Sequence, residues 1–156
     1  MTIAIFPGSF DPITYGHIDI LEKGCKIFDK VIIAVAYNIE KQGFLPVDSR
    51  INLIKECVKN IKNAEVDSFE GLTVNYAKKH NAEFIIRGLR NSKDFEYEFE
   101  MEGVNKILNP KIQTVYFTPN SQNSFISSSA VREILKNNGD VSEFVPLCVE
   151  NYLKTL

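Results

Sequence analysis

The chain has 156 residues, of which 44% are hydrophobic and 24% charged, a length and composition that favour one globular domain with one core. Its 18 basic and 20 acidic residues give a net charge of −2, so a broad basic surface for DNA or RNA is not expected. No run reaches the roughly 18 apolar residues of a membrane helix, and the first residues lack the basic region of a signal peptide. We therefore expect a cytoplasmic protein without nucleic-acid or membrane partners.

The first half of the chain alternates short apolar runs with helical patterns. Thr2–Phe6 predicts a strand, and His17–Phe28 predicts a helix with an apolar stripe. Val31–Ala36 is apolar throughout, which is typical of a strand covered on both faces. Asp48–Ile61 predicts a second helix, with Asp48 as its N-cap. Ala64–Phe69 predicts a third strand.

The second half continues the alternation. Two further strands are predicted, at Phe84–Arg87 and Ile112–Thr118. The remaining helices are predicted at Leu72–His80, Asp94–Leu108, Ser128–Asn137 and around Pro146–Leu153. Asn138 and Gly139 follow the third of these as a helix stop.

This order of elements predicts an α/β fold, an open doubly wound parallel five-stranded sheet within a single domain, residues 1–156. Right-handed crossovers place the C-terminal ends of all strands at one edge of the sheet, and ligands bind at that edge in such folds. The segments that follow each strand should therefore carry the chemistry.

Groups that bind phosphate follow every predicted strand. Gly8 and Ser9 follow the first, shortly before Gly16 and His17 open a helix, and Lys41 follows the second. The later segments contribute Gly71, Leu72 and Thr73, then Arg87 through Arg90, then Ser124 through Ser129. No acid–histidine cluster for a tightly held metal and no nucleophile–base–acid triad is apparent. The pattern favours phosphoryl or nucleotidyl transfer, in which the protein positions reactants and stabilises charge.

Each signal also has a structural explanation. His17 could cap its helix, Ser127–Ser129 could form an N-cap cluster, and Arg87 and Arg90 could be surface ion-pair residues. The alternating acids Glu96, Glu98, Glu100 and Glu102 are interpreted as mostly a solvated face. The aromatic residues between them, Phe95, Tyr97 and Phe99, are interpreted as core and subunit contact. The coincidence of independent signals at one sheet edge favours the functional interpretation.

The Cys25, Cys57 and Cys148 thiols are odd in number and widely spaced, without a CxxC pair. This argues against a zinc site and a disulfide framework. We expect reduced, mostly buried thiols.

Several of these segments resemble known motifs. Gly8–Pro12 followed by Thr14–His17 resembles the T/HxGH motif of the nucleotidyltransferase superfamily, and Ile126–Arg132 resembles its ISSTxxR motif, with Ser129 in place of Thr. Ile86–Arg90 and Asp94–Glu98 are similar to bacterial phosphopantetheine adenylyltransferases in particular. The resemblance extends from about Ile3 to Pro146.

The resemblance implies a Rossmann-like nucleotidyltransferase fold and a step of coenzyme A biosynthesis. AMP would pass from ATP to 4′-phosphopantetheine by direct in-line attack, giving 3′-dephospho-coenzyme A and pyrophosphate. Mg²⁺ would be the cofactor, held mainly by ATP phosphates and water rather than by a protein site. The resemblance further implies a homohexamer, built as a dimer of trimers, and feedback inhibition by coenzyme A.

The resemblance also implies residue roles. His17 would stabilise the transition state, while Lys41 and Arg87 would be catalytic and bind the acceptor. Ser9 would contact both substrates, and Leu72 and Thr73 would line the pantetheine arm. ATP would be bound by Ser9, Phe10, His17, Gly88, Leu89, Arg90, Glu98, Asn123, Ser124, Phe125, Ile126, Ser127, Ser128 and Ser129.

The chain departs from the family pattern at Ser9, Thr73 and Asn123, which replace Thr, Met and Trp, and in the residues before Lys41. Two alternatives stay open at this point. One is a related nucleotidyltransferase acting on nicotinamide mononucleotide or glycerol 3-phosphate, and the other is a non-catalytic sensor of ATP or coenzyme A.

Overall fold

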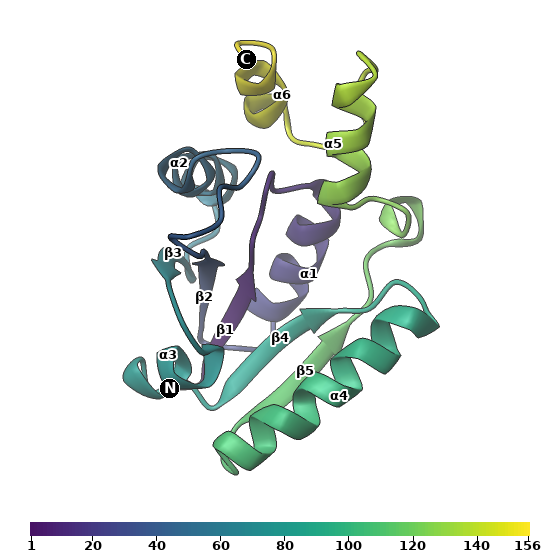
Figure 1. Cartoon of the computed structure of the whole chain (residues 1–156). Coiled ribbons are helices and arrows are strands. Elements are labelled where there is room, and N and C mark those ends of the chain that lie inside the picture. The colour runs from purple at the N-terminus through teal and green to yellow at the C-terminus, as the bar shows by residue number, and fades with distance from the viewer.

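A computed structural model describes all 156 residues as five strands alternating with helices (Figure 1). The strands are β1 (Ile3–Gly8), β2 (Lys30–Ala36), β3 (Ala64–Phe69), β4 (Phe84–Gly88) and β5 (Gln113–Phe117). The helices are α1 (Tyr15–Cys25), α2 (Val47–Val58), α3 (Thr73–Lys79), α4 (Ser92–Leu108), α5 (Ser128–Lys136) and α6 (Leu147–Leu153), with a short 3₁₀ turn, η1, at Ser121–Asn123. Every predicted element is present, with ends shifted by a few residues.

The strands form one parallel sheet in the order β3-β2-β1-β4-β5, which confirms the predicted architecture. The chain builds outward from β1 through β2 to β3, and then crosses back to place β4 on the other side of β1. Strand order therefore reverses between β1 and β4, and this is the point at which open α/β sheets bind ligands.

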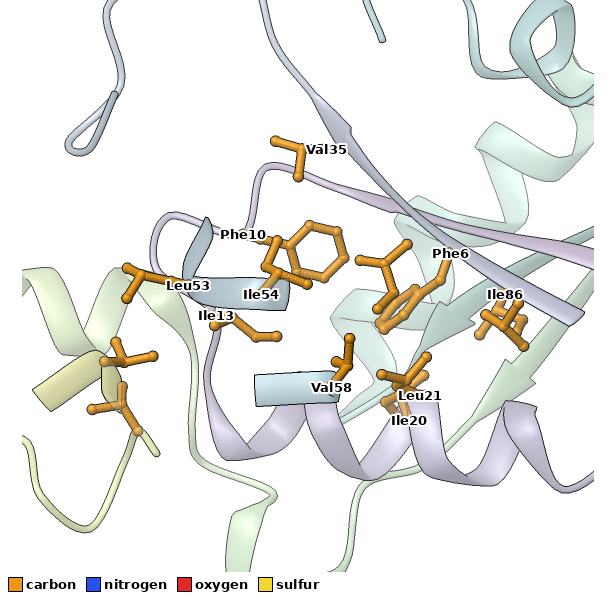
Figure 2. Packing of buried hydrophobic residues seen from close by; sticks show 14 of the residues in the cluster. Phe6, Phe10, Ile13, Ile20, Leu21, Val35, Leu53, Ile54, Val58 and Ile86 are labelled. Carbon is orange, nitrogen blue, oxygen red and sulfur yellow. The ribbon is translucent and has the colours of Figure 1, made fainter. Parts of the chain in front are cut away.

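Two apolar clusters cover the two faces of the sheet. The larger contains Phe6 and Phe10 together with Leu21 of α1 and Ile54 of α2, and it extends to α5 and α6 (Figure 2). The smaller lies on the opposite face, where Val74 and the rest of α3 pack over the strands. Because both faces are covered, the central strands are apolar at nearly every position, as the run in β2 indicated.

The predicted stop of α5 is correct, and the predicted N-cap of α2 is not. After α5, Asn138 adopts a left-handed conformation (φ 57°) and the Gly139 amide donates to the Ile134 carbonyl, so the predicted stop is confirmed. The predicted N-cap of α2 was wrong, because the helix begins one residue before Asp48 and Pro46 occupies the cap. Asp48 instead lies in the first turn, where a carboxylate interacts favourably with the helix dipole.

Helix α4 runs alongside β5 and buries little of its surface (Figure 1). Glu98 is its one buried residue, so this carboxylate does not belong to a solvated face as its spacing suggested. The assignment of its aromatic residues to the core was also wrong, because Phe95, Tyr97 and Phe99 are 48%, 60% and 63% exposed. Separately, no helix combines the length and the apolar character needed to span a membrane.

Candidate functional site

A cavity of about 370 Å³ opens at the C-terminal ends of β1 and β4, where the strand order reverses. Its walls come from the loop after β1, the start of α1, the end of β4, the side of α4 and the start of α5. The polar and glycine residues that line it are Gly8, Ser9, Thr14, Gly16, His17, Arg87, Gly88, Arg90, Asp94, Tyr97, Glu98, Ser127 and Ser128. Segments far apart in the sequence therefore meet here, as the positions of their strands predicted.

The first turn of α1 fixes the His17 ring. Thr14 is the N-cap, and its side chain accepts from the His17 amide while the His17 side chain accepts from the Thr14 amide. This reciprocal arrangement is a capping box in which histidine takes the place of the usual Glu or Gln. Nδ1 of His17 thus forms the cap, and the other ring nitrogen, Nε2, is left for the predicted ligand role.

The cap also sets the tautomer of His17. Its Nδ1 lies 3.1 Å from the Thr14 backbone nitrogen, which can only donate, so Nδ1 is the acceptor and the neutral ring carries its proton on Nε2. Burial, with further contributions from the positive charges of Arg90 and Arg87, lowers the pKa of His17 to about 4. At neutral pH the cavity therefore contains a neutral imidazole with an Nε2–H donor.

Phe10 packs behind this imidazole. Its ring meets His17 edge-on at 4.9 Å between centroids, and the residue is 1% exposed, so Phe10 supports the imidazole from the core. The Phe10 backbone is in the left-handed region, with φ 47°, and the Phe10 side chain lies in the core. A Cβ on Gly8 would lie 3.1 Å from the Phe10 ring, so packing of Phe10 accounts for the glycine.

The second motif docks directly on the first. The Ser128 hydroxyl donates to the Pro12 carbonyl at 2.7 Å, and Arg132 donates to the Asp11 carbonyl at 2.9 Å. Ser127 caps α5 by accepting from the Ala130 amide, so its predicted capping role is confirmed. As a result, the N-termini of α1 and α5 open on the same cavity, an arrangement suited to a polyanion.

Asn123 anchors the loop that leads into α5. Its Nδ2 donates to Asp19 at 2.8 Å, and Asp19 also accepts from the Asn120 backbone amide at 3.0 Å. Asp19 is 8% exposed on α1, so the loop that leads into α5 is anchored to α1 by a buried carboxylate.

The two arginines of the cavity are both paired with acids of α4. Arg87 donates to both carboxylate oxygens of Glu98, at 2.9 and 2.7 Å. Arg90 donates to Asp94 at 3.0 Å, in a more exposed pair. The sequence had offered ion pairing as the structural explanation of these arginines, and the pairs do exist, but they lie in the wall of the cavity rather than on an open surface.

A second, smaller cavity of about 180 Å³ adjoins the first and shares Pro7, Arg87, Tyr97 and Glu98 with it. Its other lining residues are Thr73, Ile85, Met101, Glu102, Asn105 and Thr114. The Thr114 hydroxyl is buried there without a hydrogen-bond partner.

Several predicted site residues lie outside both cavities. They are Lys41, Leu72, Leu89, Asn123, Ser124, Phe125 and Ser129. Lys41 is exposed in the loop after β2, Leu72 is 53% exposed, and Phe125 is 90% exposed. The structure brings together Ser9, Phe10, His17, Arg87, Gly88, Arg90, Glu98, Ile126, Ser127 and Ser128, with Thr73 in the second cavity.

The part of α4 that lines the second cavity was not predicted from the sequence. Tyr97, Met101 and Asn105 recur at intervals of four residues, which is the spacing of one helix face. That spacing was a detectable signal, but Asn and Met carry no charge that would have drawn attention to it.

No group of three or more His, Cys, Asp or Glu side chains could hold a metal ion. The cavity offers a neutral imidazole donor, two helix N-termini and two arginines, which are groups suited to binding phosphate and stabilising charge on it.

Comparison with known proteins agrees with this chemistry. Residues 5–134 match the model of the cytidylyltransferase-like family. A phosphopantetheine adenylyltransferase of Caldanaerobacter subterraneus subsp. tengcongensis is 53% identical over 94% of this chain and 91% of its own. A protein of the same name from Vesicomyosocius okutanii is 47% identical over 97% and 96%. A solved structure from Vibrio parahaemolyticus, described as a nicotinate-nucleotide adenylyltransferase, shares the fold at a TM-score of 0.75 and 18% identity over 99% of both chains.

Proposed function

Because the chain belongs to the phosphopantetheine adenylyltransferase family, within the cytidylyltransferase-like proteins, we propose that it transfers AMP from ATP to 4′-phosphopantetheine. The products are 3′-dephospho-coenzyme A and pyrophosphate, and the reaction belongs to coenzyme A biosynthesis. The observation that carries the proposal is the neutral His17 imidazole, held by Thr14 where two helix N-termini and two arginines meet.

The reaction needs little proton chemistry from the protein. An oxygen of the acceptor phosphate attacks the α-phosphorus of ATP, and the bond from that phosphorus to the β-phosphate oxygen breaks as pyrophosphate leaves. A phosphate monoester loses its second proton near a pKa of about 6, so the attacking oxygen is already anionic at neutral pH. This agrees with a site in which both carboxylates, Asp94 and Glu98, are engaged by arginines.

His17 acts as a hydrogen-bond donor in this proposal. As charge builds on the non-bridging oxygens of the α-phosphorus, the Nε2–H of the neutral ring donates to one of them. The capping box keeps the ring from turning, so the donor is in place before the reaction begins.

The two cavities divide the substrates between them. ATP occupies the larger one, with its β- and γ-phosphates at the start of α5 near Ser127 and Ser128, and its nucleoside toward Gly88 and Arg90. The same proposed nucleotide site includes Leu89, Ser124, Phe125 and Ser129. Asn123 belongs to it as well and holds its loop in place through the hydrogen bond to Asp19. Glu98 belongs to this proposed site and lines both cavities.

The acceptor places its phosphate beside Arg87, which lines both cavities, and beside Ser9 of the larger one. Its arm lies in the smaller cavity beside Thr73. Leu72 directly precedes Thr73 in the chain, and in this proposal it covers the entrance of the smaller cavity. Lys41 is proposed to bind the acceptor phosphate, and its position outside the cavities requires the loop between β2 and α2 to fold over the bound substrates.

Mg²⁺ enters as part of the substrate. Because the chain offers no ligand cluster of its own, the ion is held by the phosphates of ATP and by water, and its charge offsets theirs. Chelation of Mg²⁺ should abolish turnover while leaving the thermal stability of the ligand-free protein unchanged.

We further propose a cytoplasmic homohexamer, arranged as a dimer of trimers, that is inhibited by coenzyme A. The large apolar side chains exposed on α4 support an assembly, because contiguous exposed apolar surface is rare on monomers. These side chains are Phe95, Tyr97, Phe99, Met101, Val104, Ile107 and Leu108. Coenzyme A combines a nucleotide with a pantetheine arm and would therefore compete for both cavities. Sedimentation of the protein tests the assembly, and pyrophosphate release in the presence of added coenzyme A tests the inhibition.

The test of the reaction is pyrophosphate release from ATP and Mg²⁺ with 4′-phosphopantetheine, nicotinamide mononucleotide and glycerol 3-phosphate as separate acceptors. Release with 4′-phosphopantetheine alone is the expected result. Release with another acceptor would keep the mechanism and replace the substrate, and ATP binding without release would support a sensor.

A further inference from the structure

A buried ion pair lies at the base of the loop that carries Lys41. Asp11, in the loop after β1, and Arg50, on α2, are 6% and 5% exposed, and Nε of Arg50 lies 3.9 Å from Oδ1 of Asp11. Neither residue lines either cavity. Burial of two charges is costly unless further hydrogen bonds satisfy them, and both side chains have such partners.

The Asp11 carboxylate binds one end of the Lys41 loop, which we define as residues 37–46. Oδ2 accepts from the Phe44 amide at 2.7 Å, and Oδ1 accepts from the Leu45 amide at 2.8 Å. Both are charge-assisted hydrogen bonds to consecutive backbone donors of a segment that belongs to no helix or strand. The loop backbone is therefore held by a side chain from a different loop.

Arg50 ties the same loop end to the loop after β1. Its Nε donates to the Leu45 carbonyl and its Nη1 donates to the Ser9 carbonyl, both at 3.0 Å. A guanidinium donates in several fixed directions, so it can hold two segments at a set separation. Ser9 and the Lys41 loop, which the proposed reaction brings to the same phosphate, are thus connected through one buried side chain.

Gly43 brings the loop backbone against this pair. A Cβ at Gly43 would lie 2.7 Å from Oδ2 of Asp11 and 3.0 Å from Nη2 of Arg50, so no side chain fits without a shift. Gly43 is two residues from Lys41 in the chain. The contact with the pair therefore begins immediately after the residue that is proposed to move.

The two loops differ in their other supports. The loop after β1 is also held by α5, because Ser128 donates to the Pro12 carbonyl and Arg132 donates to the Asp11 carbonyl. The opposite end of the Lys41 loop is held by the Tyr37 amide, which donates to Phe69 of β3 at 3.1 Å. Residues 38–44 between the two ends are exposed. Loss of the Asp11–Arg50 pair should therefore release one end of the Lys41 loop and leave the Ser9 loop in place.

We propose that Asp11 and Arg50 are positioning residues, which fix the base of the Lys41 loop beside Ser9 so that Lys41 reaches the acceptor phosphate when the loop closes. A loop with a fixed base samples fewer positions, so less freedom is lost when Lys41 binds its ligand. This inference rests on the proposed function, because it takes Lys41 to bind the acceptor phosphate.

The first experiment compares Asp11→Asn with Asp48→Asn, which makes the same change at an exposed acid in the first turn of α2. An Asn at position 11 keeps the shape but can accept through only one of its two terminal atoms. Asp11→Asn should lower kcat/KM for 4′-phosphopantetheine about tenfold, the loss expected for a charged hydrogen bond, and leave the KM for ATP within about twofold. Asp48→Asn should change neither. An unchanged acceptor kcat/KM, or an equally large change in the KM for ATP, would overturn the proposal.

The second experiment repeats Asp11→Asn in a Lys41→Ala background. If Asp11 acts through Lys41, the second substitution should lower acceptor kcat/KM by no more than about twofold beyond Lys41→Ala alone. A tenfold loss in both backgrounds would show that Asp11 acts independently of Lys41 and would refute the proposal.

Gly43→Ala tests the same contact from the loop side and leaves both charges in place. Its Cβ should displace the loop from the pair, so we expect the same selective fall in acceptor kcat/KM as in Asp11→Asn. Gln42→Ala, at the adjacent exposed position, is the matched control and should behave as wild type. This variant decides the question if Asp11→Asn does not fold, and wild-type kinetics of Gly43→Ala would then count against the proposal.

Limited digestion with trypsin gives a readout without turnover. Cleavage after Lys41 should be about fivefold faster or more in Asp11→Asn than in wild type, because cleavage follows the population of the open loop, and Asp48→Asn should match wild type. Cleavage after Lys106 in α4 reports general unfolding. An equal increase at Lys106, or no increase at Lys41, would show that the pair does not anchor the loop. If no acceptor supports pyrophosphate release yet cleavage rises only at Lys41, the proposed function fails and the anchoring stands.

Discussion

Gly16 in the first turn of α1 lies against the backbone carbonyl of Ile126. A Cβ built on Gly16 would be 3.2 Å from that oxygen, closer than nine in ten Cβ contacts in proteins. The first and second motifs therefore touch at a point where a side chain would require one of them to shift by a few tenths of an ångström. The distance between the two helix N-termini that open on the cavity depends on this contact.

Gly16→Ala should consequently impair catalysis. Its gain of up to about 1 kcal/mol in helix propensity would be offset by the displaced Ile126 loop, so we expect little net change in the free energy of unfolding and a kcat reduced about tenfold. Asn75→Ala, at an exposed position of α3, serves as the control that gains propensity without a new contact. A Gly16→Ala enzyme with wild-type kcat would show that the loop tolerates the shift.

His17→Ala should lower kcat by at least about 100-fold, since loss of a transition-state donor costs roughly 3 kcal/mol. The KM for ATP should change far less. His17→Gln preserves the capping box, because Gln is a standard partner at this position, and separates loss of the cap from loss of the imidazole. The measurement is the steady-state kinetics of both variants. Loss of ATP binding with an intact kcat would contradict the role of His17 as a transition-state donor.

The same residue should make stability depend on pH. The pKa of His17 is lowered from 6.5 to about 4 in the folded protein, so protons bind the unfolded chain more readily at this site. Its contribution to stability is fully present above pH 6.5 and is lost progressively as the pH falls toward 4. Urea denaturation at pH 8 and pH 5 should therefore show a smaller loss for His17→Gln than for wild type. Equal losses would mean that His17 titrates normally.

The thiols should be dispensable for the reaction. Burial raises the pKa of Cys25 to about 11, and burial together with Cys148 raises the pKa of Cys57. Protonated thiols are poor nucleophiles, so we expect slow labelling by Ellman's reagent and kcat values within about twofold of wild type for each Cys→Ser variant. A folded but inactive Cys variant would refute this interpretation.

The sequence predicted the alternation of elements because strands buried on both faces carry a continuous apolar run, as in β2. It also placed His17, Arg87 and Ser127 at one sheet edge, because parallel strands end together. It did not reveal that Glu98 is buried, because the alternating acids around it have the pattern of a solvated helix face. Nor did it foresee the proximity of Cys57 and Cys148, whose sulfurs are 3.3 Å apart across 91 residues of chain.

The positions of Asn123 and Lys41 could not be predicted from the sequence for another reason. Both belong to loops, where position depends on tertiary contacts rather than on periodicity. Asn123 is held by Asp19, an interaction spanning 104 residues that no local pattern announces. Lys41 extends from a loop outside both cavities, so its predicted role depends on a movement that the sequence cannot specify.

The most direct test of the account follows the α-phosphate of ATP. With α-labelled ATP, Mg²⁺ and 4′-phosphopantetheine, the label should appear in a product with the mass of 3′-dephospho-coenzyme A, in a 1:1 ratio to unlabelled pyrophosphate. Label in free AMP, in the protein, or in the product of a different acceptor would contradict direct adenylyl transfer to 4′-phosphopantetheine.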